Sequence, residues 1–352
     1  MQNFNPRVSG LFLLCLVLVY IVILAGGTVR ATGAGMGCPD WPLCFGKFIP
    51  PTSEAELPEN WKNFLHGSQA ENPSFNPVHT WTEYLNRLAG ALLGLVSLTL
   101  VVFCFASNRV TNKTLYFAVG ALISVIFNGW LGSQVVASDL RPLLISLHMM
   151  GAFLVQVFLI LGFINSRVSN VFPNVFPTIS EAFNKRANIY IGVCVLCLVI
   201  QIGMGIQIRE SVDWVFKLDE LFDRENLIDI VPWVFYVHRS FSWVLLVFAV
   251  LAMSYIVKSK VNPGTKLREI LKWKFLFGDV KVRWGGLYII LVVAQMLIGG
   301  ALNHLGFPMF VQPLHLLAAN LMFGVLCFLF FCESGIVNYE KNQALQSRAI
   351  PT

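Results

Sequence analysis

Eight long apolar runs dominate this sequence, and they limit what the chain can fold into more than any other feature. A helix needs about 20 apolar residues to cross the hydrocarbon core of a bilayer. Only helices and closed barrels satisfy their backbone groups in lipid, and none of the runs alternates as a barrel strand does. We therefore predict an all-α integral membrane protein with eight transmembrane helices. The runs lie at about 9–28, 83–107, 114–137, 142–165, 187–208, 232–257, 284–303 and 310–332.

The composition agrees with a membrane protein. Of the residues, 56% are hydrophobic and only 12% are charged, whereas a soluble domain has about 25% charged residues. The net charge of +6 is not taken as a sign of nucleic-acid binding, because Lys and Arg in membrane proteins concentrate in the loops on the cytoplasmic side. We expect contact with membrane lipid and no nucleic-acid partner.

The basic residues predict the orientation. The loop 258–283 holds eight Lys and Arg, whereas the loop 208–231 holds three among many acids. The positive-inside rule then places both termini in the cytoplasm and the long loops 29–82 and 208–231 outside. The first run is interpreted as a span rather than a cleaved leader. The expected location is a bacterial plasma (inner) membrane.

The sequence contains an internal repeat of a four-helix unit. Run 1 ends "GGTVR" and run 5 ends "GIQIR", while run 2 opens "EYLNR" and run 6 opens "FYVHR". Each unit has an even number of spans, so the copies share one topology and form a parallel repeat. We predict two four-helix bundles. The predicted parts are an N-terminal unit at 1–166, a cytoplasmic linker at 167–186, a C-terminal unit at 187–335 and a cytoplasmic tail at 336–352.

The repeat places four polar residues near the outer ends of the even-numbered runs. They pair as Asn86 with His148 in the first unit and as His238 with His315 in the second. Imidazole within a bilayer is costly and usually functional, although a histidine can simply bond a neighbouring helix. Zinc would need further ligands. Two histidines that face each other across a helix bundle suit the axial ligands of a haem iron.

Two arginines directly follow ligand positions near the predicted outer surface. Arg87 follows Asn86 and Arg239 follows His238. A guanidinium suits the two carboxylates of a haem, so both are propionate candidates. The alternative is that they simply snorkel towards the membrane surface.

Glu83 lies one turn before Asn86 on the same helix face. It could accept a proton during an oxidation or position a water molecule. The alternative is structural, because "TWTE" at 80–83 fits a capping box with Thr80 as the cap. In the second unit Phe235 takes the place of Glu83, which favours chemistry in the first unit.

The remaining cysteines and histidines are expected to have structural or no roles. Six cysteines lie in or at the ends of spans, and "CVLC" at 194–197 is interpreted as small apolar packing. We expect His66 and His79 of the outer loop to be solvated. His304, at the outer end of run 7, is not expected to be a ligand.

Several of these motifs resemble those of a known protein family. The stretch "GGTVRATGAGMGCPDWPLC" at 26–44, then "EYLNR" at 83–87 and the helix histidines His148, His238 and His315 are similar to haem A synthases over all eight runs. This resemblance implies a membrane oxidoreductase that converts haem O to haem A. A methyl group of haem O would become a formyl group through hydroxylated intermediates.

The resemblance also implies roles for individual residues. His238 and His315 would hold a haem b iron, and His148, Asn86 and Arg87 would lie at the substrate haem. Glu83 would act in catalysis, and Arg239 stays a candidate for a haem propionate. Cys38 and Cys44 would form a disulfide.

The chain departs from the family pattern at Asn86, where a histidine is usual. Asparagine cannot ligate a ferric haem as imidazole does, so the first unit would hold its haem more weakly. Weaker ligation suits a substrate that must bind, react and leave.

A rival function and the partners stay open from the sequence. A b-type membrane cytochrome would carry electrons without changing its haem, but it predicts two bis-ligated haems and no use for Glu83. Pathway logic suggests a haem O synthase and terminal oxidase assembly factors as partners. A homo-oligomer is neither predicted nor excluded.

Overall fold

The computed structural model describes residues 5–65, 67–71, 73–108, 110–167, 180–218, 232–265, 267–270, 276 and 278–348. Its eight long helices are long and apolar enough to cross a membrane, which confirms the predicted fold class. These helices are α1 (Pro6–Ala31), α3 (Pro77–Ala106), α4 (Asn112–Ala137), α5 (Pro142–Arg167), α6 (Glu181–Leu218), α8 (Val234–Lys260), α11 (Val280–His304) and α12 (Val311–Arg348). Short helical segments are η1 (Ala34–Met36), η2 (Glu54–Glu56), η3 (Trp61–Phe64), α2 (Ser68–Glu71) and α9 (Leu267–Ile270).

The start of α3 corrects the sequence-based boundary. The helix begins at Pro77 rather than at 83, and its N-cap is Asn76, whose side chain accepts from the backbone N–H groups of Val78 and His79. Proline at the first helical position and asparagine at the cap are a favourable pair. The predicted capping box with Thr80 as cap is therefore wrong. Thr80 lies inside the helix, and its Oγ1 donates to the carbonyl oxygen of Gly37 at 2.9 Å.

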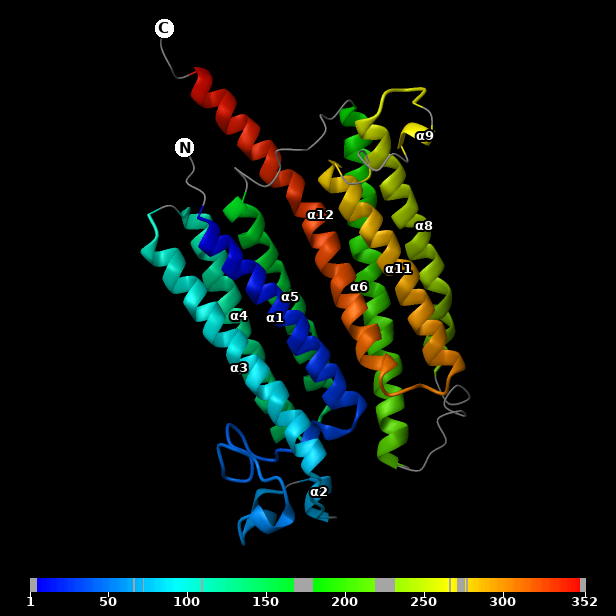
Figure 1. The fold of residues 1–352 in the computed structure, drawn as a ribbon. Helices are drawn as coiled ribbons and strands as arrows, with labels where there is room; N and C mark the ends of the chain where they lie inside the picture. Colours follow the sequence, from blue (N-terminus) through cyan, green and yellow to red (C-terminus); the bar gives the residue numbers. More distant parts are fainter. Residues whose placement is uncertain are drawn as a thin grey trace.

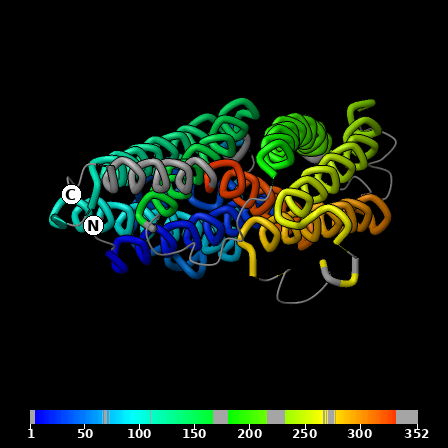
Figure 2. Tube along the Cα trace, turned by 90° about the horizontal axis from the view of Figure 1, so that it is seen from above, coloured from blue at the N-terminus to red at the C-terminus, as the bar shows by residue number. Residues whose placement is uncertain are grey.

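The helices form two rings with the same order of neighbours. In the first ring α1 packs against α3 and α5, and α4 closes the ring between them. In the second ring α6 packs against α8 and α12, and α11 closes the ring. The two bundles lie side by side in Figures 1 and 2. This arrangement confirms two four-helix bundles of parallel topology.

The two bundles meet along α12, which packs against α1 and α5. Phe153 and Phe323 cross this boundary with ring centroids 4.7 Å apart. A hydrogen bond of 2.9 Å runs from Nε2 of Gln156 to Oδ1 of Asn320, and both side chains are buried. Interhelical hydrogen bonds of this kind stabilise helix pairs in lipid. The boundary is therefore a packed interface that fixes one bundle against the other.

The two chain termini and the disulfide loop lie at opposite ends of the helix bundles. The N-terminal end of α1 and the C-terminal end of α12 lie at one end of the molecule, and the segment between α1 and α3 lies at the other (Figure 1). The structure extends α12 through much of the predicted tail, to Arg348. Most of the predicted linker, residues 168–179, lies outside the described residues. Which end faces the cytoplasm stays a prediction.

Candidate functional site

The two histidines predicted to hold an iron face each other in the second bundle. His238 lies in the first turns of α8 and His315 in the first turns of α12. Their ring centroids are 6.4 Å apart. A metal–imidazole bond is about 2 Å long, so two nitrogens on opposite sides of one metal lie roughly 4 Å apart and the ring centroids somewhat further. The observed separation fits an iron between the rings.

Backbone carbonyls orient two of the three helix histidines. Nδ1 of His238 lies 3.1 Å from the carbonyl oxygen of Gln201 on α6. Nδ1 of His148 lies 3.0 Å from the carbonyl oxygen of Asn128 on α4. A carbonyl can only accept, so each Nδ1 carries the proton and each Nε2 keeps its lone pair. This second interaction is the usual way to orient a metal-binding histidine.

A glycine on the neighbouring helix lies against each of the four polar positions. A Cβ added to any of these glycines would meet the facing side chain at 3.2–3.6 Å, so the flat ring or amide packs directly on the backbone. The sequence pairs two of these glycines, Gly26 and Gly205, across the repeat, since "GGTVR" matches "GIQIR". The pairs are Gly26 with Asn86, Gly132 with His148, Gly205 with His238 and Gly299 with His315.

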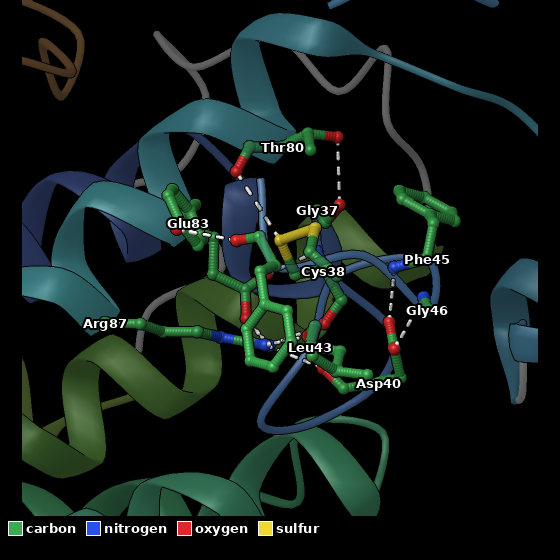
Figure 3. Close-up of a disulfide and its surroundings, with 12 residues drawn as sticks. Gly37, Cys38, Asp40, Leu43, Phe45, Gly46, Thr80, Glu83 and Arg87 are labelled. Atoms are coloured by element: carbon green, nitrogen blue, oxygen red, sulfur yellow. Dashed lines mark hydrogen bonds and ion pairs between the residues drawn. A yellow bond between two sulfur atoms is a disulfide. The ribbon is translucent and has the colours of Figure 1, made fainter. Parts of the chain in front are cut away.

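Glu83 joins α3 to the disulfide loop (Figure 3). Cys38 and Cys44 are bonded to each other, as expected from the resemblance. The Glu83 side chain is only 3% exposed. Its Oε2 accepts from the backbone N–H of Cys38 at 2.8 Å, and its Oε1 accepts from Nη2 of Arg87 at 2.5 Å. Both carboxylate oxygens therefore have fixed partners.

Arg87 bonds to backbone carbonyls of the disulfide loop, whereas the sequence suggested a haem propionate as its partner. Its guanidinium donates to the carbonyl oxygens of Cys38 and Asp40, each at 2.6 Å, and of Leu43 at 3.0 Å. Figure 3 shows the side chain reaching under the disulfide loop. Arg87 therefore anchors the loop, and its donors are not directed at a free carboxylate. Arg239, its counterpart in the second unit, is exposed, with its guanidinium 5.7 Å from the Tyr236 ring centroid.

The disulfide loop has a small core of its own and sits tightly on α3. Phe45 and Leu65 are buried beside the disulfide. Asp40 accepts from the backbone N–H groups of Phe45 at 2.5 Å and Gly46 at 2.9 Å, which closes the turn. A Cβ at Gly37 would lie 2.4 Å from the carbonyl oxygen of His79, so only glycine allows this approach. The loop is thus a fixed element above the first bundle.

A cavity of about 2590 Å³ opens at the loop end of the first bundle. Its walls include Glu83, Asn86, Arg87 and His148. Pockets for small molecules usually measure about 300–1,000 Å³, so this one has room for a large flat ligand. His79, expected to be solvated, is instead half-buried and lines the cavity. The structure therefore gathers all four first-unit candidates in one place.

The cavity extends to the boundary with the second bundle, where sequence reasoning missed a charged cluster. Asp213 of α6 accepts from Arg30 of α1 and lies 2.7 Å from Arg209 of α6. All three residues line the cavity. The sequence did hold a sign of this cluster, because the matching motifs "GGTVR" and "GIQIR" end in Arg30 and Arg209.

The other expectations on single residues can now be compared with the structure. His304 is exposed and contacts Asn303. His66 lies outside the described residues. Within the part of the chain that the structure describes, no group of three or more His, Cys, Asp or Glu could hold a metal ion. The six cysteines of the spans are buried, which agrees with the packing role predicted for Cys194 and Cys197: Cys15, Cys104, Cys194, Cys197, Cys327 and Cys332.

Comparison with known proteins gives the family. The chain is similar to Heme A synthase of Shewanella oneidensis, with 30% identity over 46% of both chains. It is also similar to Heme A synthase of Alkalihalophilus pseudofirmus, with 28% identity over 45% of this chain and 47% of the relative. Heme A synthase of Bartonella tribocorum is 23% identical over 74% of this chain and 77% of that protein. The chain thus spans about half the length of the first two relatives in these matches.

A family profile covers much more of the chain. The profile described as cytochrome oxidase assembly protein matches residues 9–327, a range that begins in α1, ends in α12 and includes the disulfide loop. Because this match covers most of the sequence, the protein belongs to the COX15-CtaA family of cytochrome oxidase assembly proteins.

Proposed function

We propose that this protein is a haem A synthase, an oxidoreductase that converts a methyl group of haem O to the formyl group of haem A. The observation that carries the proposal is the cavity of the first bundle, which brings Glu83, Asn86 and His148 to the same walls. The names of the relatives support haem A synthesis. The resemblance adds the route, in which the methyl group is hydroxylated twice and the resulting gem-diol loses water. This route removes four electrons from the methyl carbon, so an external electron acceptor would have to take them.

The second bundle would hold a haem b as resident cofactor. His238 and His315 fit the two axial positions by their separation, and the carbonyl of Gln201 leaves the Nε2 lone pair of His238 for the iron. The glycines behind both rings let them stand close to their neighbouring helices. When bound, such a haem supplies one-electron transfer. Arg239 stays a propionate candidate here, because it is exposed beside His238.

The first bundle would hold the substrate haem. His148 has the same oriented ring as His238, with Nδ1 towards the carbonyl of Asn128, so its Nε2 can ligate one face of the iron. Asn86 would stand on the opposite face, and its Oδ1 is buried without a hydrogen-bond partner. An amide is a much weaker ligand than imidazole. This asymmetry suits a haem that binds for one reaction and then leaves.

Glu83 is the proposed catalytic carboxylate. It lines the cavity and lies one turn from Asn86 on the same face of α3. A positioned carboxylate can take the proton that leaves the oxidised methyl group or orient a water molecule. The Cys38 N–H and the Arg87 guanidinium hold its two oxygens in place. The disulfide loop would therefore position the base as well as cover the site.

A b-type cytochrome that only carries electrons is the weaker alternative. Such a protein needs two tightly held haems, and the paired positions of the first bundle hold one histidine, His148, and one asparagine, Asn86. It also leaves a buried carboxylate in the cavity wall without a purpose.

The same proposal includes location and partners. We infer a bacterial plasma membrane with cytoplasmic termini, from the positive-inside rule and the basic loop 258–283. The disulfide at the opposite end agrees with an oxidising outer side. A haem O synthase would supply the substrate, and terminal oxidase assembly would use the product.

Pigment analysis tests the proposed function directly. The chain is expressed in cells that make haem O but lack haem A, and the haems are extracted from membranes and separated by chromatography. We expect haem A in these membranes and none in cells with the empty vector. If haem O remains the only modified haem although the protein is present in the membrane, the proposal fails.

A further inference from the structure

Two large apolar side chains, Phe48 and Ile49, form an exposed tip on the disulfide loop. Phe48 is 83% exposed and Ile49 is 71% exposed. They directly follow a closed turn, in which the backbone N–H of Lys47 donates to the carbonyl oxygen of Cys44 at 3.1 Å. The next residue, Pro50, is buried again. The turn therefore holds a small apolar surface outward from the loop.

A contact with α3 fixes the depth of this tip. The hydroxyl of Tyr84 donates to the carbonyl oxygen of Phe48 at 2.7 Å. Tyr84 lies at the start of the apolar run of α3, which continues with Leu85. Side chains on a helix point towards its N-terminus, so Tyr84 reaches from this run towards the loop. The tip therefore lies close to the level at which the membrane-spanning part of α3 begins.

The face of α3 that carries Tyr84 is the one that meets lipid. Leu88, Leu92 and Leu95 follow Tyr84 at spacings of four, four and three residues, which places them on the same side of the helix. All three leucines are exposed. In a helix that crosses a membrane, apolar side chains that the protein leaves uncovered contact the acyl chains. The tip and the lipid contact of α3 therefore form one continuous surface.

The charges of the loop divide in the same way. Between Trp41 and Ser53 the one charged residue is Lys47, whereas residues 54–71 have four Glu and one Lys. Removing a carboxylate from water is costly. The segment with the tip can enter the headgroup region without this cost, because it has no acidic residue, whereas the glutamates favour water for the rest of the loop.

We propose that Phe48 and Ile49 insert into the bilayer at the boundary between headgroups and acyl chains, so that lipid anchors the disulfide loop. Aromatic and large apolar side chains are favoured at this depth. The same loop donates the Cys38 N–H to Glu83, so the anchor connects the membrane surface to the wall of the cavity. Such an anchor is independent of the reaction proposed above.

Photo-crosslinking in a defined bilayer tests this anchor. The photoreactive amino acid p-benzoylphenylalanine replaces Phe48 or Ile49 in the full chain, in nanodiscs of phosphatidylethanolamine and phosphatidylglycerol, and mass spectrometry identifies the adducts. Ala55, exposed in η2 of the same loop, is the matched control, and Leu92 is the lipid-facing reference. We expect lipid adducts at positions 48 and 49 to exceed those at 55 by roughly tenfold or more, since burial of one large apolar side chain shifts its distribution by at least that factor.

Two outcomes would overturn the proposal. Lipid adducts at positions 48 and 49 as rare as those at position 55 would place the tip in water. Crosslinks to a second copy of the chain, in place of lipid, would assign the surface to a protein contact. The mass of the non-reduced peptides shows that each variant retains the bond between Cys38 and Cys44. None of these measurements requires haem A formation, so a failure of the anchor and a failure of the proposed function are told apart.

Discussion

Replacing Glu83 by glutamine would separate the chemistry of the carboxylate from its structural role. The side chain keeps its size, but an amide has one acceptor oxygen where the carboxylate has two. Glu83 accepts from the Cys38 N–H and from Arg87, so the variant can satisfy only one of these donors. The exchange therefore removes the base and loosens one attachment of the disulfide loop.

The two effects differ in size. An unsatisfied buried donor costs about 1–3 kcal/mol. Removing one partner of a buried ion pair costs roughly 3–5 kcal/mol of stability. In Glu83→Gln the loss of stability should be smaller, because Arg87 still donates to three loop carbonyls. Loss of a general base lowers a rate by about 10²–10⁴. We expect haem A formation to fall at least a hundredfold, with the haem of the second bundle retained.

Asp40→Asn is the matched control. Asp40 also accepts from two backbone N–H groups, those of Phe45 and Gly46, so its amide likewise leaves one donor unsatisfied and loosens the loop. Its carboxylate bonds within the loop, and Asp40 is not among the residues that line the cavity.

The assay measures haem O, hydroxylated intermediates and haem A in extracts of membranes that contain equal amounts of each variant. Reduced spectra give the content of haem b. Formation of haem A by Glu83→Gln at the wild-type rate would refute the catalytic role. An equal loss of activity in Asp40→Asn would show that loop position, rather than the carboxylate, limits the reaction.

Three further substitutions test the haem sites and the loop. His238→Ala should lose low-spin haem b, while His304→Ala, which changes an exposed histidine, should keep it; a normal reduced spectrum in the first variant would place the ligand elsewhere. Asn86→His should convert the first site to two histidine ligands, so low-spin haem should accumulate and haem A release should slow; unchanged spectra would mean that Asn86 does not face the iron. Gly37→Ala pushes a methyl group to 2.4 Å from the carbonyl oxygen of His79, and overpacking of this kind costs about 1–3 kcal/mol; faster proteolysis of the loop in membranes is expected, and wild-type protection would contradict the tight packing.

The sequence predicted the helices well because lipid imposes their length and polarity. Their boundaries were less accurate where the helices continue past the apolar segment. α3 starts at Pro77 rather than 83 because an Asn-Pro pair caps it in a polar stretch. α6 runs from Glu181 to Leu218, beyond the apolar run 187–208 at both ends. Hydropathy marks the hydrocarbon core, and it does not record how far a helix extends outside it.

The partners of the site residues could be predicted only in part. The pairing of His238 with His315 follows from the repeat, because equivalent helices put equivalent residues at one depth. The partners of Arg87 depend on how the loop folds back over α3, and its contacts with Cys38 and Leu43 join residues more than 40 positions apart. The spacing of residues along the sequence carries no record of such contacts.

The repeat also indicates where the difference in function lies. Both bundles have the same ring of helices, and both place a glycine behind each polar position. This shared frame would suit a haem in each bundle, but it cannot explain why one haem would react and the other stay. The explanation must lie where the copies differ.

Asn86 stands where the second bundle has His238, and Glu83 stands where it has Phe235. The first change weakens iron ligation and the second adds a carboxylate, and the disulfide loop fixes that carboxylate in the cavity wall. In the proposed function, these differences together would turn a frame that retains a haem into one that can modify and release it.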